Sequence, residues 1–495
     1  MAACEEFDVV VVGAGLSGIA AGHHLQTECP GRSYVVLESR AAIGGTWDLF
    51  RYPGVRSDSD MFTLGYSFRP WTSDAAIAPG PAIRDYVRET ARLHGVDRHI
   101  RFGHRVTAAQ WGSAQARWTV SVLAGGGELQ FRCRFLYFCS GYYDYAQGHV
   151  PELAGRAGFQ GRIVHPQQWP ADLDYTGRRV VVIGSGATAV TLLPEMAARA
   201  AHVTMLQRSP GYIVALPSRD AIGAALQRLL PARLAYHLIR WKNILLALGL
   251  YNYARLWPAS ARRLLMRAAQ ARLGPAFDAQ RHLQPSYDPW DQRLCIAPDA
   301  DLFRALRSGK ASIVTDAIET LTPDGIRLAS GAELPADIIV TATGLRLQML
   351  GGAAVSVDGV PVDFGRTVAW RGMMVSGVPN LALAMGYTNA PWTLKCELTA
   401  RQVCRLLNHL QATGMDICVP VHADPASATE PAIGLTSGYV QRAAGKLPRQ
   451  GARPPWRVHQ NYVRDLLALK FSSLHDGAMR FARRGHLPGS PGPMP

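Results

Sequence analysis

Two glycine-rich loops carry the residues with the clearest chemical meaning in this sequence. The first, Gly13-Ala14-Gly15-Leu16-Ser17-Gly18, follows an apolar run and fits the pattern G-x-G-x-x-G. Such a loop lets the backbone approach a pyrophosphate, and its third glycine lets the following helix pack on the strand. Glu38 ends the next apolar run, where a carboxylate can accept hydrogen bonds from ribose hydroxyls. We therefore predict that Gly13, Gly15, Gly18 and Glu38 bind a dinucleotide, and the position of the loop near the N-terminus favours FAD.

The second loop, Gly184-Ser185-Gly186-Ala187-Thr188-Ala189, fits G-x-G-x-x-A. The next apolar run ends in Gln207-Arg208-Ser209, where the first unit has an acid. An acid would repel a 2′-phosphate, whereas Arg208 can pair with it and Ser209 can donate a hydrogen bond. We predict NADPH rather than NADH here, bound by Gly184, Gly186, Ala187, Thr188, Arg208 and Ser209. The alternative interpretation of Arg208 is a solvated loop charge.

Each loop needs a strand before it and a helix and a strand after it. The first unit is predicted as a strand over 8–12, a helix over about 16–27 and a strand over 34–37, and the second unit begins at Arg179. Residues 103–135 and 311–344 alternate as strands do. These patterns predict an α/β fold with two Rossmann-like dinucleotide-binding domains, for FAD and NADPH, and an inserted helical segment.

The expected domain boundaries follow from the order of these units. We expect residues 1–145 and 346–487 to form the FAD-binding domain, and residues 146–215, which include a linker, and 284–345 to form the NADPH-binding domain. Residues 216–283 are expected to be the helical insertion. The Pro/Gly-rich residues 488–495 are expected to be a flexible tail.

Two longer patterns lie in and between these units. Phe159, Gly161, His165 and Trp169 belong to F-x-G-x-x-x-H-x-x-x-W-P, and Gly44-Gly45-Thr46-Trp47 is followed by Pro53-Gly54-Val55-Arg56-Ser57-Asp58. With these patterns the sequence resembles the type I Baeyer–Villiger monooxygenases of the flavin-containing monooxygenase superfamily. The segments 289–295 and 386–389 make it most similar to the ethionamide-monooxygenase type within that family.

The resemblance implies an FAD- and NADPH-dependent monooxygenase. It would insert one oxygen atom of O2 next to a ketone carbonyl through a C4a-peroxyflavin, and it would also oxygenate sulfides or thioamides. The family pattern makes Arg293 and Asp58 the catalytic candidates. It adds Gly45, Thr46 and Trp47 to the FAD site and makes Asp58 a cofactor-binding residue as well. It gives His165 a positioning role between domains. Gln292 departs from the family, many of whose members have a basic residue before the arginine.

Two other enzyme classes stay open from the sequence. One is an N- or S-oxygenating flavin monooxygenase without ketone activity. Trp169-Pro170 argues against this class, because such enzymes usually lack the tryptophan of the pattern. The other is an NADPH oxidase or reductase that transfers no oxygen. A flavin-binding redox sensor without enzymatic activity is a third alternative.

The amino-acid composition limits the kinds of partner that this chain is expected to bind. Of the 495 residues, 48% are hydrophobic and 18% are charged, and the net charge is +15 without a dense Lys/Arg tract, which argues against nucleic-acid binding. The eight cysteines form no C-x-x-C pair, which argues against a disulfide reductase and predicts free thiols in the cytoplasm. We expect no metal. Residues 221–273 alternate arginine with apolar residues at helical spacing, which indicates packed amphipathic helices or, alternatively, a peripheral membrane or substrate-access surface.

Overall fold

Two short runs of valine and isoleucine form the central strands of two separate sheets. In the computed structural model, which describes residues 4–485, these strands are β1 (Glu5–Val12) and β8 (Arg179–Ile183). Both strands are buried on both faces: Val9 and Val11 pack in one core, and Val10 and Val12 pack in another. Strands of this kind are typical of parallel sheets covered on both sides. The predicted α/β class is confirmed, while the predicted tail 488–495 lies outside the described residues.

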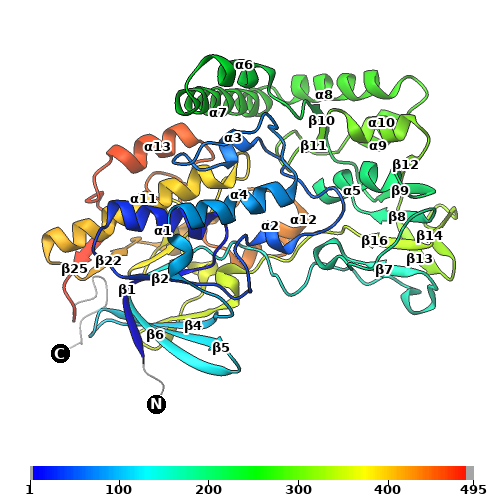
Figure 1. The fold of residues 1–495 in the computed structure, drawn as a ribbon. Coiled ribbons are helices and arrows are strands. Elements are labelled where there is room, and N and C mark those ends of the chain that lie inside the picture. Colours follow the sequence, from blue (N-terminus) through cyan, green and yellow to red (C-terminus); the bar gives the residue numbers. More distant parts are fainter. Residues whose placement is uncertain (1–3, 486–495) are drawn as a thin grey trace.

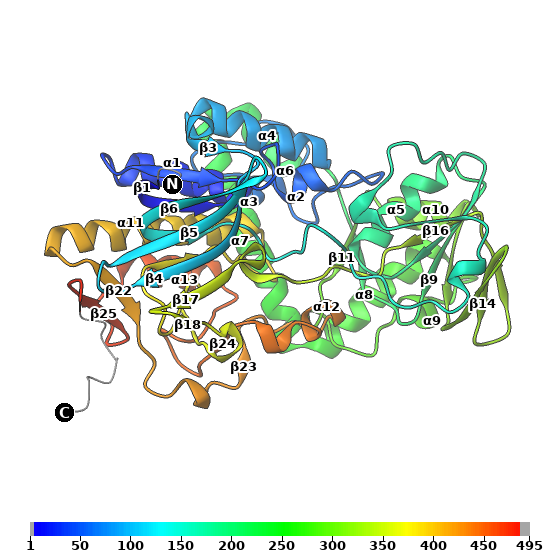
Figure 2. The same cartoon turned by 90° about the horizontal axis from the view of Figure 1, so that it is seen from below.

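The first lobe, on the left in Figure 1, is built on a nine-stranded sheet. Its parallel part has the order β3-β2-β1-β6-β21, with β2 (Tyr34–Leu37), β3 (Ile100–Arg101), β6 (Gly127–Phe138) and β21 (Leu381–Leu383). The first half of β6 continues into a second group of strands, β4 (Arg105–Gly112), β5 (Arg117–Ala124), β17 (Ala354–Val357) and β18 (Val360–Pro361). Figure 2 shows this group from below.

The helices of the first lobe lie on the face of the parallel strands that points away from β4, β5, β17 and β18. The principal ones are α1 (Leu16–Glu28), α4 (Gly80–Leu93), α11 (Trp392–Thr413) and α13 (Tyr462–Phe471). Val9 and Val11 of β1 share a core with Leu25 of α1 and Val403 of α11. Two short helices, α2 (Thr46–Leu49) and α3 (Met61–Leu64), flank the loop that carries Asp58.

The second lobe is built on five parallel strands in the order β12-β9-β8-β16-β7. Their bounds are β7 (Arg162–Val164), β9 (His202–Gln207), β12 (Ala311–Thr315) and β16 (Ile338–Thr341), with β8 as given above. Helices α5 (Ala187–Ala197) and α10 (Asp301–Arg307) pack against this sheet, and β13 (Ile318–Thr322), β14 (Gly325–Leu328) and β15 (Glu333–Pro335) form an antiparallel extension. The unit β8-α5-β9 therefore repeats the arrangement of β1-α1-β2.

Two linkers join the lobes and run side by side. The first linker, 139–161, leaves β6, and the second, 342–353, follows β16. The N–H of Asp144 donates to Arg346 O (2.9 Å) and the N–H of His149 donates to Gly344 O (3.0 Å). The linkers are therefore bonded to each other and not only to the lobes.

Helices α6 (Ala221–Leu229), α7 (Ala232–Leu256) and α8 (Pro258–Leu273) lie across the top of both lobes in Figure 1. Together with α9 (Ala279–Leu283) they form the inserted segment between β10 (Ile213–Leu216) and β11 (Cys295–Pro298). Helix α7 packs on α3 of the first lobe, and α8 packs on α9, α10 and β10 of the second. Among the described residues, no helix is long and apolar enough to cross a membrane.

A buried ion pair fixes α7 to the first lobe. Arg240 donates to Glu397 of α11 (3.0 Å) and to the carbonyl oxygens of Phe62 (2.9 Å) and Gly65 (2.7 Å). Both charged side chains are almost fully buried. The helical insertion is thus fixed to a lobe from which it is distant in sequence.

Gly18 is expected to tolerate no side chain. A methyl group there would lie 1.8 Å from Gly13 O, so the Gly18→Ala variant should lose roughly 3 kcal/mol or more of unfolding free energy. Thermal unfolding measures this loss. Gly249→Ala is the matched control, because its site within α7 is open and the substitution should stabilise by roughly 0.5–1 kcal/mol. Equal melting temperatures for Gly18→Ala and the unchanged chain would contradict the close contact.

Candidate active site

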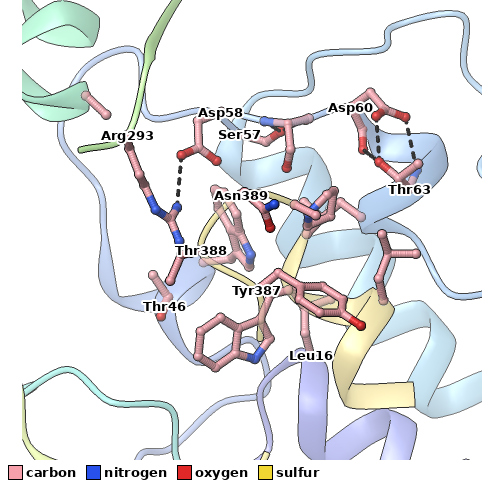
Figure 3. A pocket seen from close by; sticks show the side chains of 18 of the residues that line it. Leu16, Thr46, Ser57, Asp58, Asp60, Thr63, Arg293, Tyr387, Thr388 and Asn389 are labelled. Atoms are coloured by element: carbon pink, nitrogen blue, oxygen red, sulfur yellow. Dashed lines mark hydrogen bonds and ion pairs between the residues drawn. The ribbon is translucent and has the colours of Figure 1, made fainter. Parts of the chain in front are cut away.

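An open cavity of about 1480 Å³ lies where the two lobes and the helical insertion meet. Ligand pockets usually enclose roughly 300–1,000 Å³, so this cavity has room for more than one ligand. Its walls come from the first glycine loop, the loop carrying Asp58, the start of α5, the inserted helices and the segment 387–394. Figure 3 shows the part around Asp58 and Arg293.

The first glycine loop forms one wall of the cavity. Its Ala14 N–H donates to the carboxylate of Glu38 (2.7 Å), which is buried and ties the loop to the end of β2. Gly15 faces Gly45, and a methyl group on Gly15 would lie 3.6 Å from Gly45 Cα. Of the residues predicted for FAD, those that line the cavity are Gly13, Gly15, Glu38, Gly45, Thr46 and Trp47. Gly18 instead lies behind the loop, against Gly13 O.

The second glycine loop repeats the backbone geometry of the first. The N–H of Gly184 donates to Leu206 O (2.8 Å), as that of Gly13 donates to Leu37 O (2.8 Å). Both glycines have positive φ, +140° and +103°. Ala187 and Thr188 line the cavity, whereas Gly184 and Gly186 are not part of its wall.

Arg208 and Ser209 lie exposed directly after β9, outside the cavity wall. The backbone carbonyl of Ser209 accepts a hydrogen bond from the Ser185 hydroxyl (2.9 Å), which connects this turn to the second glycine loop. Within residues 4–485, Arg208 forms no ion pair and no side-chain hydrogen bond. Its guanidinium is therefore available to an external anion.

Arg293 and Asp58 come from different lobes and meet in the cavity (Figure 3). The guanidinium Nη1 lies 3.3 Å from Asp58 Oδ2, and the two side chains are 33% and 43% exposed. Burial alone lowers the pKa of Arg293, but the neighbouring Tyr142 and Asp58 outweigh burial and raise the pKa above its usual value. The Nε–H of Arg293 is buried without a partner among the described residues. The site therefore holds a fixed positive charge, and its buried Nε–H is free to donate.

His165 lies outside the cavity, between the two linkers. Its Nδ1 accepts from the N–H of Gln167 (3.2 Å), so the proton is on Nε2, which donates to Gly344 O (3.3 Å). The ring also fills the space beside Gly148, where a methyl group would lie 2.0 Å from Cε1. Burial lowers the pKa of His165, although the bond to Gly344 opposes the shift. The histidine thus contacts both connections between the lobes in its neutral form.

The other members of the 159–170 pattern are packing residues. Phe159 is buried against the β13–β15 extension, and Gly161 leaves room for the Phe159 ring, since a methyl group there would lie 2.5 Å from Phe159 Cζ. Trp169 packs against the core of the second lobe. None of these three, nor His165, lines the cavity.

Several cavity residues were not among those predicted from the sequence. Asp60 caps α3 and accepts from Asn243 of α7 (2.9 Å), and burial raises its pKa. Asn389 donates to Gln460 O (2.9 Å), while its Oδ1 is buried without a partner among the described residues. Tyr142 lies in the first linker beside Arg293 and Trp392. The segment 386–389 was noted for its similarity to relatives, but no residue in it was predicted to line a site.

Comparison with known proteins identifies the family. Residues 7–245 match the family model described as flavin-binding monooxygenase-like. The chain is 52% identical to the FAD-containing monooxygenase EthA of Mycobacterium tuberculosis and 51% identical to EthA of Mycolicibacterium smegmatis, with 97% of this chain and 98% of each relative covered. A solved steroid monooxygenase bound to NADP has the same fold, with a TM-score of 0.77 at 22% identity, covering 97% of this chain and 100% of that one. The chain therefore belongs to the flavin-binding monooxygenase-like family, as the resemblance predicted.

Proposed function

We propose that this chain is an NADPH-dependent flavin monooxygenase that inserts one oxygen atom of O2 next to a ketone carbonyl and also oxygenates sulfides or thioamides. The observation that carries the proposal is Arg293, a cation in a cavity between two dinucleotide-type loops, whose Nε–H has no partner in the described part of the chain. Donors fixed where negative charge develops on oxygen stabilise a transition state most effectively. Asp58 would act as a positioning residue that holds the guanidinium in place.

The first loop fits FAD. Its glycines leave the wall free of side chains where a pyrophosphate would approach, and the 13-residue helix α1 begins there. Glu38 has lone pairs left for ribose hydroxyls after accepting from the N–H groups of Ala14 and Arg40 (2.7 and 2.8 Å). Gly45, Thr46 and Trp47 would line the other side of the same ligand.

The second loop fits NADPH. Gly184 and Gly186 lead into the N-terminus of the 11-residue helix α5, and Ala187 and Thr188 reach the cavity. Arg208 follows the end of β9 and forms no ion pair with the residues that the structure describes; in this kind of fold it would contact a 2′-phosphate. NADP in the solved steroid monooxygenase supports the choice of nucleotide.

Bound FAD and NADPH supply the hydride transfer and the activation of O2, and the protein supplies orientation and charge. Arg293 would donate to a negatively charged oxygen, because its pKa keeps it protonated throughout the physiological range. Apolar residues of the inserted helices, such as Leu264 and Leu265, line the cavity and would limit the access of water.

Replacing Arg293 by alanine should uncouple NADPH oxidation from oxygen transfer. We expect about 100-fold less oxygenated product per NADPH consumed, with hydrogen peroxide formed instead, because one positively charged donor is lost. Product and peroxide are measured together with a cyclic ketone and an aryl methyl sulfide. Arg255→Ala is the control, since Arg255 also pairs with an aspartate, Asp291 (2.6 Å), but does not line the cavity. If the Arg293→Ala variant still coupled NADPH oxidation to oxygen transfer as the unchanged chain does, Arg293 would have no role in the mechanism.

The same measurements on the unchanged chain separate the reaction classes. Sulfoxide without any ester or lactone would reject Baeyer–Villiger activity and leave an S-oxygenating enzyme. Peroxide as the sole product with every substrate would leave an NADPH oxidase.

Replacing Arg208 by alanine should weaken the preference for NADPH over NADH. A charge-assisted bond to phosphate contributes about 1.5–3 kcal/mol, so kcat/KM for NADPH should fall about ten- to hundredfold while that for NADH stays the same. Steady-state kinetics with both nucleotides measures the ratio. Arg178→Ala is the control, because Arg178 is exposed at the opposite edge of the sheet, before β8. An unchanged ratio in Arg208→Ala would contradict the assignment.

A further inference from the structure

The outer face of α7 is apolar where a helix on a protein surface usually carries charges. Leu234, Leu238, Trp241 and Leu245 follow one another at spacings of four, three and four residues, which places them on one face of the helix. Their exposed fractions lie between 39% and 56%. The opposite face is buried on the first lobe through Tyr236, Ile239, Arg240 and Ile244. A helix that is apolar on both sides is normally covered on both.

The apolar surface continues onto the neighbouring helices and borders the cavity. Ile222 of α6, Leu246 and Leu250 of α7 and Leu264 of α8 are more than half exposed, and all four also line the cavity. Trp257, between α7 and α8, is 59% exposed. We call this surface, formed by the exposed apolar side chains of α6, α7 and α8, the apolar patch. In Figure 1 these three helices lie together at one edge of the molecule.

The helices that carry the apolar patch bear charges of one sign. Residues 221–273 contain nine lysines and arginines and no aspartate or glutamate. Five of the arginines are exposed and form no ion pair with any residue between 4 and 485: Arg228, Arg233, Arg263, Arg267 and Arg272. Exposed leucine and tryptophan side chains next to arginines without acidic partners are typical of helices that lie in the surface of an anionic membrane.

We propose that the apolar patch docks on an anionic lipid bilayer, with α7 lying in the interface. A second copy of the chain is a poorer occupant, because a twofold contact would place the same unpaired arginines against one another. Anionic headgroups neutralise these arginines, and the acyl region covers the leucines. The mouth of the cavity then opens toward the bilayer, so that an apolar substrate reaches the site without crossing water.

Vesicle co-sedimentation of the full FAD-loaded chain tests the docking directly. We expect binding to vesicles containing about 30% phosphatidylglycerol, weakening as salt is raised, and little binding to phosphatidylcholine alone. The double variant Leu238→Ser/Leu245→Ser should bind about tenfold more weakly. Its matched control is Leu123→Ser/Val360→Ser, which removes two exposed apolar side chains from β5 and β18 of the first lobe and should leave binding unchanged. Leu238 and Leu245 do not line the cavity, so turnover of a small soluble substrate should also persist and report correct folding.

A charge-reversal pair tests the electrostatic part. Arg233→Glu/Arg267→Glu should weaken binding to the anionic vesicles by at least about 25-fold, and the control Arg92→Glu/Arg98→Glu, exposed elsewhere on the first lobe, should not. A chain that stays in the supernatant with both vesicle types would overturn the proposal. Equal binding to neutral and anionic vesicles would also overturn it. A third contrary result is a chain that forms a dimer, where the Leu238→Ser/Leu245→Ser substitutions dissociate the dimer but leave vesicle binding unchanged. Vesicle binding needs no turnover, so its failure is distinct from failure of the proposed reaction.

Discussion

Each glycine loop is held against the end of the strand beside it, and the arrangement of both lobes follows from that contact. A methyl group would lie 2.8 Å from Cys139 O if added to Gly13, and 2.3 Å from Ala342 O if added to Gly184. Cys139 and Ala342 are also the first residues of the two linkers. The loops and the linkers therefore share the same edge of each sheet. Because ligands of parallel sheets bind at the carboxyl ends of the strands, both glycine loops lie where a ligand in the crevice between the lobes would reach them.

The helical insertion closes this crevice because it is attached on both sides. The Arg240–Glu397 pair fixes α7 to the first lobe, while α8 packs on the second. Removing one partner of a buried pair leaves an uncompensated charge, which typically costs 3–5 kcal/mol. Helix α7 is therefore fixed on its inner face, while on its outer face Trp241 contacts Tyr462 of α13 (ring centroids 5.9 Å apart) and the leucines stay largely exposed. The same rigidity holds Asn243 against Asp60 in the cavity.

The sequence predicts what depends on local signals. The strand over 34–37 and the helix after Gly15 were predicted correctly, because apolar runs and glycine loops are local patterns. Helix α11 begins at Trp392. Its first two turns contain Lys395 and Glu397, whose charges suggest solvent, yet both are buried beside partners 70 and 157 residues away. Asp58 and Arg293 were found only through the family pattern, and Asn389 and Tyr142 as cavity residues were not found, because their positions depend on long-range packing.

The doubled connection between the lobes has a mechanical consequence. A single flexible strand would leave one lobe free to rotate about three axes relative to the other. Two linkers bonded to each other along 143–149 and 344–347, with His165 contacting both, resist twisting of one lobe on the other. The helical insertion, which packs on both lobes, resists bending across the linkers as well. The separation of Asp58 and Arg293 and the separation of the two glycine loops therefore depend on the same three connections.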